Sequence, residues 1–152
     1  MKKHMNLLRL LLMIFWIAFI FSRSLKPGSL SSADSKHWLS ILLSILPFPI
    51  SELFLRKMAH FAEFFVLGTL SGGLFFTPER HLLRQAVPSS ILVCFVTALN
   101  DETIQLFVEG RSGNVTDVWI DMAGALCGLL LVLLIAYLRR KWKLKKTASE
   151  QA

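Results

Sequence analysis

The sequence is poor in charged residues and in cysteine, and both shortages exclude classes of protein. Asp, Glu, Lys and Arg make up 18% of the 152 residues, whereas a soluble domain carries about 25%. The two cysteines, Cys94 and Cys127, lie in apolar runs without metal-ligand spacing, so we expect inert small hydrophobes. A glycine-rich phosphate loop is also missing. These shortages exclude a disordered chain, a disulfide scaffold and an ordinary soluble enzyme.

Hydrophobic residues are abundant instead, at 54% of the chain, and the mean hydropathy is +0.56. The formal net charge of +7 comes largely from six Lys and Arg residues between Arg139 and Lys146, directly after an apolar run. This placement is typical of a membrane flank. We therefore expect a membrane protein in contact with lipid, and no nucleic-acid partner.

Four apolar windows are long enough to cross a bilayer, which requires about 20 residues. They cover about 7–25, 55–76, 86–108 and 115–138. No small-x-small cleavage site follows the first window, so we interpret it as an uncleaved signal anchor. The predicted fold is an all-α membrane protein, a single domain built as a bundle of four transmembrane helices.

The distribution of basic residues predicts the orientation in the membrane. With both termini in the cytoplasm, eleven Lys and Arg residues lie inside and six outside, as the positive-inside rule favours. The predicted location is the plasma membrane, with 22–54 and 109–114 outside, and with 77–85 and a basic tail of 139–152 inside. An apolar piece at 37–47 is too short to span and is broken by Pro47. We expect it to form a short helix at the outer interface.

Polar residues within the spans gather at one depth. At 1.5 Å of rise per residue, those in the spans lie about 3–12 Å below the outer boundary, and on each helix they share a face; Arg111 joins them from the loop. They come from the second span, the end of the third span, the following loop and the start of the fourth span: Lys57, His60, Glu63, Asp101, Glu102, Gln105, Arg111, Asp117 and Asp121.

Two interpretations of this convergence remain open. The residues bind a polar ligand, because intramembrane ionisable groups usually mark function, or they form a purely structural salt-bridge network. In either case we expect Arg111 to pair with Asp117 or with Asp101 and Glu102. Six acids, with Glu109 included, face only three bases, with Arg56 included. Protonated carboxyls or a bound cation would restore the balance.

Two Gly-x-x-x-Gly pairs, Gly68/Gly72 and Gly124/Gly128, allow close approach of helices. We expect them to pack against each other within the chain, with a dimer interface as the alternative.

The motifs resemble the VanZ-like family across about 55–128. The resemblance rests on Lys57-Met58-Ala59-His60-Phe61-Ala62-Glu63-Phe64, on Asp101-Glu102-x-x-Gln105, on Gly110-Arg111-Ser112-Gly113, and on Asp117-Val118-x-x-Asp121-x-x-Gly124. Phe64 stands where many relatives carry Tyr, and Asp121 where others carry Asn. The resemblance implies a small integral membrane protein of the bacterial envelope that is associated with resistance to the glycopeptide teicoplanin.

Two functions are compatible with these residues. The favoured hypothesis is a non-enzymatic protein without a cofactor, whose nine convergent residues bind an extracytoplasmic lipid-linked cell-wall precursor or another amphiphile, such as a glycopeptide-like ligand. The alternative is a metal-dependent enzyme that acts on a lipid phosphate or an isoprenoid-linked intermediate. There, Asp101, Glu102, Asp117 and Asp121 would hold a divalent cation. His60 or Glu63 would exchange protons, and Arg111 and Lys57 would bind phosphate.

Overall fold

A computed structural model describes residues 2–45, 49–76 and 83–150. Its elements are α1 (Lys2–Ser24), α2 (Gly28–Ile45), α3 (Glu52–Phe75), α4 (Leu83–Leu106) and α5 (Val115–Glu150). These described residues contain no β-strand. The prediction of an all-α protein is confirmed.

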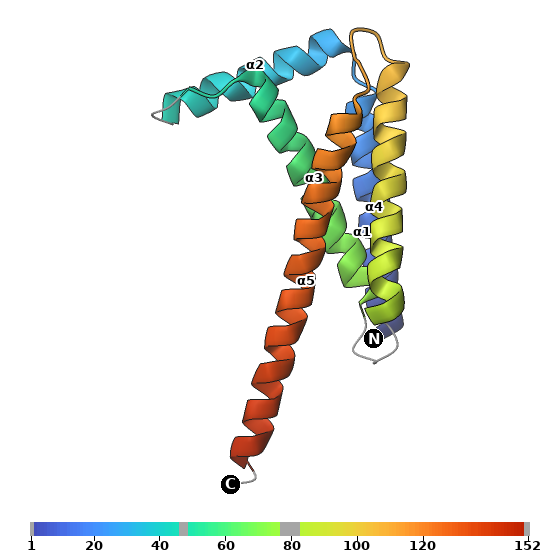
Figure 1. Cartoon of the computed structure of the whole chain (residues 1–152), viewed down its shortest axis with the longest axis vertical. Coiled ribbons are helices and arrows are strands. Elements are labelled where there is room, and N and C mark those ends of the chain that lie inside the picture. The colour runs from blue at the N-terminus through green and yellow to red at the C-terminus, as the bar shows by residue number, and fades with distance from the viewer. Residues whose placement is uncertain (1, 46–48, 77–82, 151–152) are drawn as a thin grey trace.

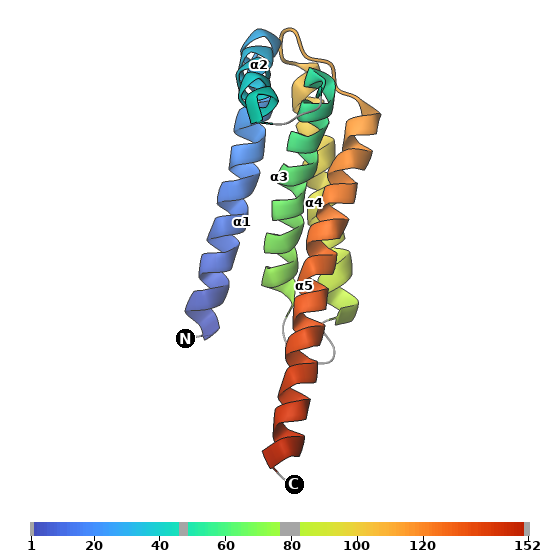
Figure 2. The same ribbon diagram turned by 90° about the vertical axis from the view of Figure 1, so that its left-hand side faces the viewer.

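Four of the helices run side by side along the long axis, and α2 lies across one end of the bundle (Figures 1 and 2). The chain rises through α1, descends through α3, rises through α4 and descends through α5. Both termini consequently lie at the end opposite α2. The crosswise helix was predicted over 37–47, but it begins earlier, at Gly28. The predicted break at Pro47 lies outside the described residues.

Three of the helices are long and apolar enough to cross a membrane by their own length and composition: Asn6–Ser24, Glu52–Phe75 and Val115–Leu144. The prediction of four spans is therefore supported for α1, α3 and α5 only. Helix α4 has 24 residues, about 36 Å of helix. Its last two turns contain Asn100, Asp101, Glu102 and Gln105, and these polar residues lower its hydropathy.

Helices α3 and α5 form the most extensive helix contact of the fold. Glycines bring the two backbones together, since a Cβ atom on Gly68 would overlap the backbone of Ala125, and one on Gly124 would overlap the carbonyl oxygen of Phe61. A Cβ on Gly128 would likewise overlap the carbonyl oxygen of Phe65. Small residues permit such approach in membrane helices, where packing and dispersion replace the hydrophobic effect. The prediction that the two glycine pairs pack within the chain is confirmed.

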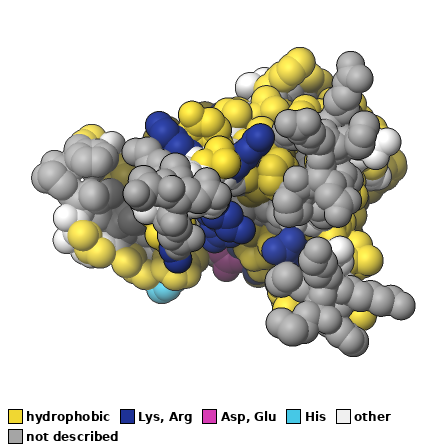
Figure 3. All heavy atoms as spheres, turned by 90° about the horizontal axis from the view of Figure 1, so that it is seen from below, with side chains coloured by type: hydrophobic (Ala, Val, Ile, Leu, Met, Phe, Trp, Pro, Cys, Tyr) yellow, Lys and Arg dark blue, Asp and Glu magenta, His cyan; other side chains and the backbone are white. Residues whose placement is uncertain are grey.

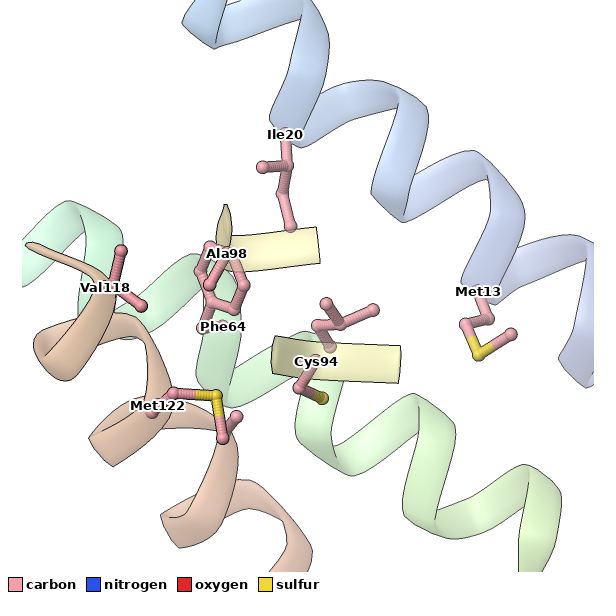
Figure 4. Packing of buried hydrophobic residues seen from close by; sticks show 9 residues of the cluster. Met13, Ile20, Phe64, Cys94, Ala98, Val118 and Met122 are labelled. Carbon is pink, nitrogen blue, oxygen red and sulfur yellow. The ribbon is translucent and has the colours of Figure 1, made fainter. Parts of the chain in front are cut away.

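A compact apolar core lies between the four long helices (Figure 4). Met13 and Ile20 come from α1, Phe64 from α3, Cys94 and Ala98 from α4, and Val118 and Met122 from α5. Ile20, Phe64 and Ala98 are fully buried members of this cluster. Cys94 is buried in this core, whereas Cys127 is exposed. The core fixes the four helices directly beneath the polar residues described next.

The exterior of the bundle is largely apolar. Large hydrophobic side chains such as Phe15, Leu92, Trp119 and Leu130 are exposed on the long helices, and hydrophobic atoms cover much of the described surface seen from below (Figure 3). Such a surface suits lipid rather than water. The residues of the predicted basic tail continue α5, which runs through Arg139 and Arg140 to Glu150.

Candidate functional site

Four ionisable side chains from three helices meet near the end of the bundle that carries α2. His60 lies on α3, Asp101 and Glu102 on α4, and Asp121 on α5. His60 Nδ1 is 3.2 Å from Asp121 Oδ1 and 3.8 Å from Asp101 Oδ2. One potential ligand atom from each residue lies within 4.8 Å of the others. We call these four residues the buried cluster.

The helical repeat explains why this cluster is buried. An apolar core residue lies three or four positions away on each contributing helix: Phe64 beside His60, Ala98 beside Asp101, and Ala125 beside Asp121. Positions with this spacing share one helix face. The faces that build the core therefore also direct the polar side chains inward, one turn closer to α2. Asp101 and Asp121 are 1% and 0% exposed.

Neutral donors surround most of the cluster oxygens. The Ser24 hydroxyl donates to Asp101 Oδ1. Gln105 Nε2 donates to Asp101 Oδ2 at 3.0 Å and to Glu102 Oε1 at 3.2 Å, and the Asn114 backbone N–H donates to Glu102 Oε2 at 2.6 Å. Asp121 Oδ2 differs, since it is buried and has no hydrogen-bond partner among the described residues.

Two ion pairs flank the buried cluster and involve three of the predicted site residues, Lys57, Asp117 and Glu63. Lys57 Nζ lies 3.0 Å from Asp117 Oδ1, which joins α3 to α5. Arg23 Nε lies 2.6 Å from Glu63 Oε1, which joins α1 to α3. Both pairs are partly exposed, so each is expected to contribute about 1 kcal/mol or less to stability. Lys57 and Asp117 thus form an ion pair with each other rather than with residues of the buried cluster.

Arg111 does not pair with Asp117, Asp101 or Glu102, and that prediction is wrong. Its guanidinium donates instead to the backbone oxygens of Arg23 and Ser24, at 3.0 and 3.3 Å, and to Ser31 Oγ at 3.3 Å. The last carbonyl groups of a helix have no partner within it and attract cationic donors.

A backbone hydrogen bond holds the loop that carries Arg111 against the junction of α1 and α2. The N–H of Gly28, the first residue of α2, donates to the Glu109 oxygen at 2.9 Å. Gly110 has a positive φ of 71°, which glycine adopts at little cost. This turn brings the guanidinium to the carbonyls of α1 rather than to the carboxylates. Burial lowers the pKa of Arg111 from its usual value, and repulsion from Arg56 adds to the shift.

An open pocket of about 380 Å³ lies beside the buried cluster, between α1, α2 and α3. Part of its lining is apolar, from Trp16, Phe19 and Val66. Trp38, Leu55, Ala59 and Ala62 add to this apolar part. The polar and charged lining residues are His60, Glu63, Gln105, Ser24, Ser31, Ser35, Asp34, Arg23, Arg56 and Arg111. The pocket thus joins a hydrophobic part to a charged part, as an amphiphile requires.

The charges in this pocket do not balance. Glu63 pairs with Arg23, and Asp34 pairs with Lys26. The Arg56 side chain makes no ion pair or hydrogen bond with any residue that the structure describes. The hydrogen bonds of Arg111 go to neutral groups, and its Nε is buried without a partner. Neither Arg56 nor Arg111 therefore forms an ion pair with a carboxylate among the described residues.

The sequence interpretation missed Arg23 and Ser24, which bring α1 into the site. Both lie at the last turn of the first candidate span, Asn6–Ser24, and extending the depth comparison to that span would have found them. The four metal ligands proposed from the sequence also differ from the observed grouping. His60 takes the place of Asp117, which is occupied by Lys57.

Comparisons with known proteins agree with the motif resemblance. The model of the VanZ/LLP1 family matches residues 9–136, which extends well beyond the motif region on both sides. Searches of curated proteins and of solved structures give no match. The matched region contains all five helices at least in part. The chain belongs to the VanZ/LLP1 family.

Proposed function

We propose that this protein binds a lipid-linked amphiphile with an anionic head group from the outer leaflet. The observation that carries the proposal is the pocket between α1, α2 and α3, in which Arg56 and Arg111 form no ion pair with any carboxylate that the structure describes. A guanidinium offers a planar fork of donors that matches phosphate and carboxylate. A phosphate-bearing head group would therefore supply the missing negative charge.

The lining supports binding of the hydrophobic part as well. Trp16 and Phe19 on α1, together with Val66 on α3, provide an apolar wall. The Trp16 ring is fixed because its Nε1 donates to the Glu63 backbone oxygen at 2.8 Å. An aromatic ring held in one orientation loses little entropy when a ligand arrives. The acyl or isoprenoid chain of the ligand would lie along this wall.

The proposal includes a membrane arrangement. Helices α1, α3, α4 and α5 would all cross the plasma membrane, with α2 in the outer interface and both termini in the cytoplasm. The up-and-down path of the chain and the common position of its termini support this arrangement (Figure 2). Helix α4 would cross the membrane because Asp101, Glu102 and Gln105 at its polar end are buried within the bundle rather than exposed to lipid.

A role in glycopeptide susceptibility follows from such binding. A protein that sequesters or presents a lipid-linked cell-wall precursor changes the amount of target that teicoplanin meets at the outer surface. We propose this as the physiological consequence, and lipid binding as the molecular activity.

The enzymatic alternative has one specific observation in its favour, the buried cluster with its four potential metal ligands. In that case His60 would be a metal ligand, and Glu63, which lines the pocket, would exchange a proton with a lipid phosphate. Lys57 could not bind the phosphate as predicted without leaving Asp117. Phosphate release from a lipid phosphate by the purified protein would favour this alternative.

Lipid co-purification tests the binding proposal. The protein and its Arg56→Gln variant would be purified in mild detergent, and retained lipids identified by mass spectrometry against the bulk membrane extract. We expect an anionic lipid to be enriched in the wild type. In the variant this enrichment should be about tenfold lower, because a hydrogen bond to a charged group contributes about 1.5–3 kcal/mol.

Lys36→Gln is the matched control. Lys36 is an exposed cation on α2 at the same end of the bundle, outside the pocket lining. Its removal should leave the enrichment unchanged. Equal lipid composition in the wild type and Arg56→Gln would contradict the proposal.

A further inference from the structure

The buried cluster has the dimensions of a metal-ion site. Two ligands bound to one zinc ion at about 2.0–2.2 Å lie at most about 4.4 Å apart. The ligand atoms of His60, Asp101, Glu102 and Asp121 lie within 4.8 Å of one another. Small side-chain rotations would therefore bring all four around a single ion.

Asp121 provides a second and independent indication. Its side chain is fully buried, one carboxylate oxygen contacts His60 Nδ1 at 3.2 Å, and the other has no hydrogen-bond partner among the residues that the structure describes. An oxygen in this position loses its hydration without compensation, which costs several kcal/mol if the group is charged. A cation within the cluster would satisfy it.

The charge balance points in the same direction. Three carboxylates in the cluster face one imidazole. No Lys or Arg among the described residues forms an ion pair with these carboxylates, because Lys57 pairs with Asp117 and Arg23 pairs with Glu63. The Arg111 guanidinium donates its hydrogen bonds to backbone oxygens and to Ser31 Oγ. A divalent cation would neutralise two of the three negative charges.

The surrounding hydrogen bonds match the usual support of metal ligands. Carboxylates that bind metal are themselves held by further donors, which fix their orientation. Ser24 and Gln105 hold Asp101, while Gln105 and the Asn114 backbone hold Glu102. The donors come from α1, α4 and the loop before α5, so the carboxylates are fixed from several sides.

We propose that His60, Asp101, Glu102 and Asp121 bind one divalent transition-metal cation. Three carboxylate ligands and one imidazole suit Mn²⁺ or Zn²⁺ better than Mg²⁺ or Ca²⁺, which prefer oxygen alone. His60 also lines the pocket, so the ion would lie beside the head group of a bound lipid. The proposal does not depend on lipid binding.

Metal uptake by the purified full chain is the test. Protein in detergent would be stripped with a chelator and dialysed against MnCl₂ or ZnCl₂, and bound metal counted by mass spectrometry. We expect about one ion per chain. Asp121→Asn should raise the metal Kd by at least about tenfold, because even loss of a supporting group costs 10–100-fold in affinity.

Glu52→Gln is the control, since Glu52 is a carboxylate in the first turn of α3, about two turns from His60 and outside the four ligands. It should keep the wild-type Kd. His60→Gln provides a second test if Asp121→Asn does not fold, because His60 is less buried. Arg56→Gln should bind metal normally, which separates this proposal from lipid binding. Failure of the wild type to take up Mn²⁺ or Zn²⁺, or unchanged Kd values in both Asp121→Asn and His60→Gln, would overturn it.

Discussion

His60 Nδ1 on α3 lies 3.2 Å from Asp121 Oδ1 on α5. This contact stands one helical turn from the glycine-mediated approach of the same helices, where Gly124 meets the backbone of Phe61. The close backbones place both side chains within reach of each other in the interior. Packing and polar chemistry in this protein therefore depend on the same pair of helices.

The contact between α3 and α5 predicts a strong effect of adding one methyl group. Gly124→Ala should destabilise the protein by about 1–3 kcal/mol, because the new Cβ would overlap the Phe61 carbonyl oxygen and force the helices apart. Thermal unfolding in detergent measures the effect. Gly73→Ala is the control, since a Cβ there meets nothing within 4 Å. Equal melting temperatures for the two variants would refute the packing argument.

Arg111 should stabilise the junction of α1, α2 and the loop before α5. Arg111→Ala should cost about 1.5–3 kcal/mol, because charged donors are removed from three oxygens. In double-mutant cycles, Ser31→Ala should couple to Arg111→Ala, whereas Asp117→Asn should be additive with it. Coupling to Asp117 with none to Ser31 would support the ion pair that the sequence suggested.

Glu63 allows the ligand site to be separated from a structural network. Its pair with Arg23 is partly exposed, so Glu63→Gln should change the melting temperature little. The variant should nevertheless lower teicoplanin tolerance at equal protein level, because Arg23 would lose its partner at the pocket and change the binding of the head group. Parallel loss of stability, expression and tolerance would favour a purely structural role.

The membrane arrangement can be tested with introduced cysteines. Ser112 is exposed in the loop between α4 and α5, and Ser149 is exposed near the far end of α5. Ser112→Cys should react with a membrane-impermeant thiol reagent in intact cells, and Ser149→Cys only after lysis. The parent chain, with its own cysteines, provides the background. The reverse labelling pattern would place the pocket on the cytoplasmic side.

Several features followed from the sequence because they depend on local periodicity. Apolar runs of about 20 residues predicted α1, α3 and α5. The spacing of the glycines on α3 and α5 predicted close packing of these helices within the chain. The depth of the polar residues predicted that Asp101 on one helix and Asp121 on another lie at the same level of the bundle. Each of these inferences needs only the rise and repeat of one helix at a time.

Other features depend on how helices are placed relative to one another, and the sequence did not reveal them. The contact of Arg111 with the end of α1 requires the loop to cross over that helix, which no local pattern encodes. The pairs of Lys57 with Asp117 and of Arg23 with Glu63 depend on rotation of the helices about their axes. Those two pairs decide which carboxylates remain for a cation and which arginines remain for a ligand.

The central claim is that the pocket between α1, α2 and α3 holds an anionic lipid. The most direct measurement is photo-cross-linking in membranes, with a lipid phosphate that carries a diazirine in its chain. We predict saturable cross-links near Trp16, Phe19 and Val66, which unlabelled lipid phosphate competes away and Arg56→Gln reduces. Cross-links to exposed Leu130 on α5 should resist competition, because ordinary bilayer lipid covers that surface. Cross-links that spread evenly over the exterior, with none competed from the pocket residues, would contradict the claim.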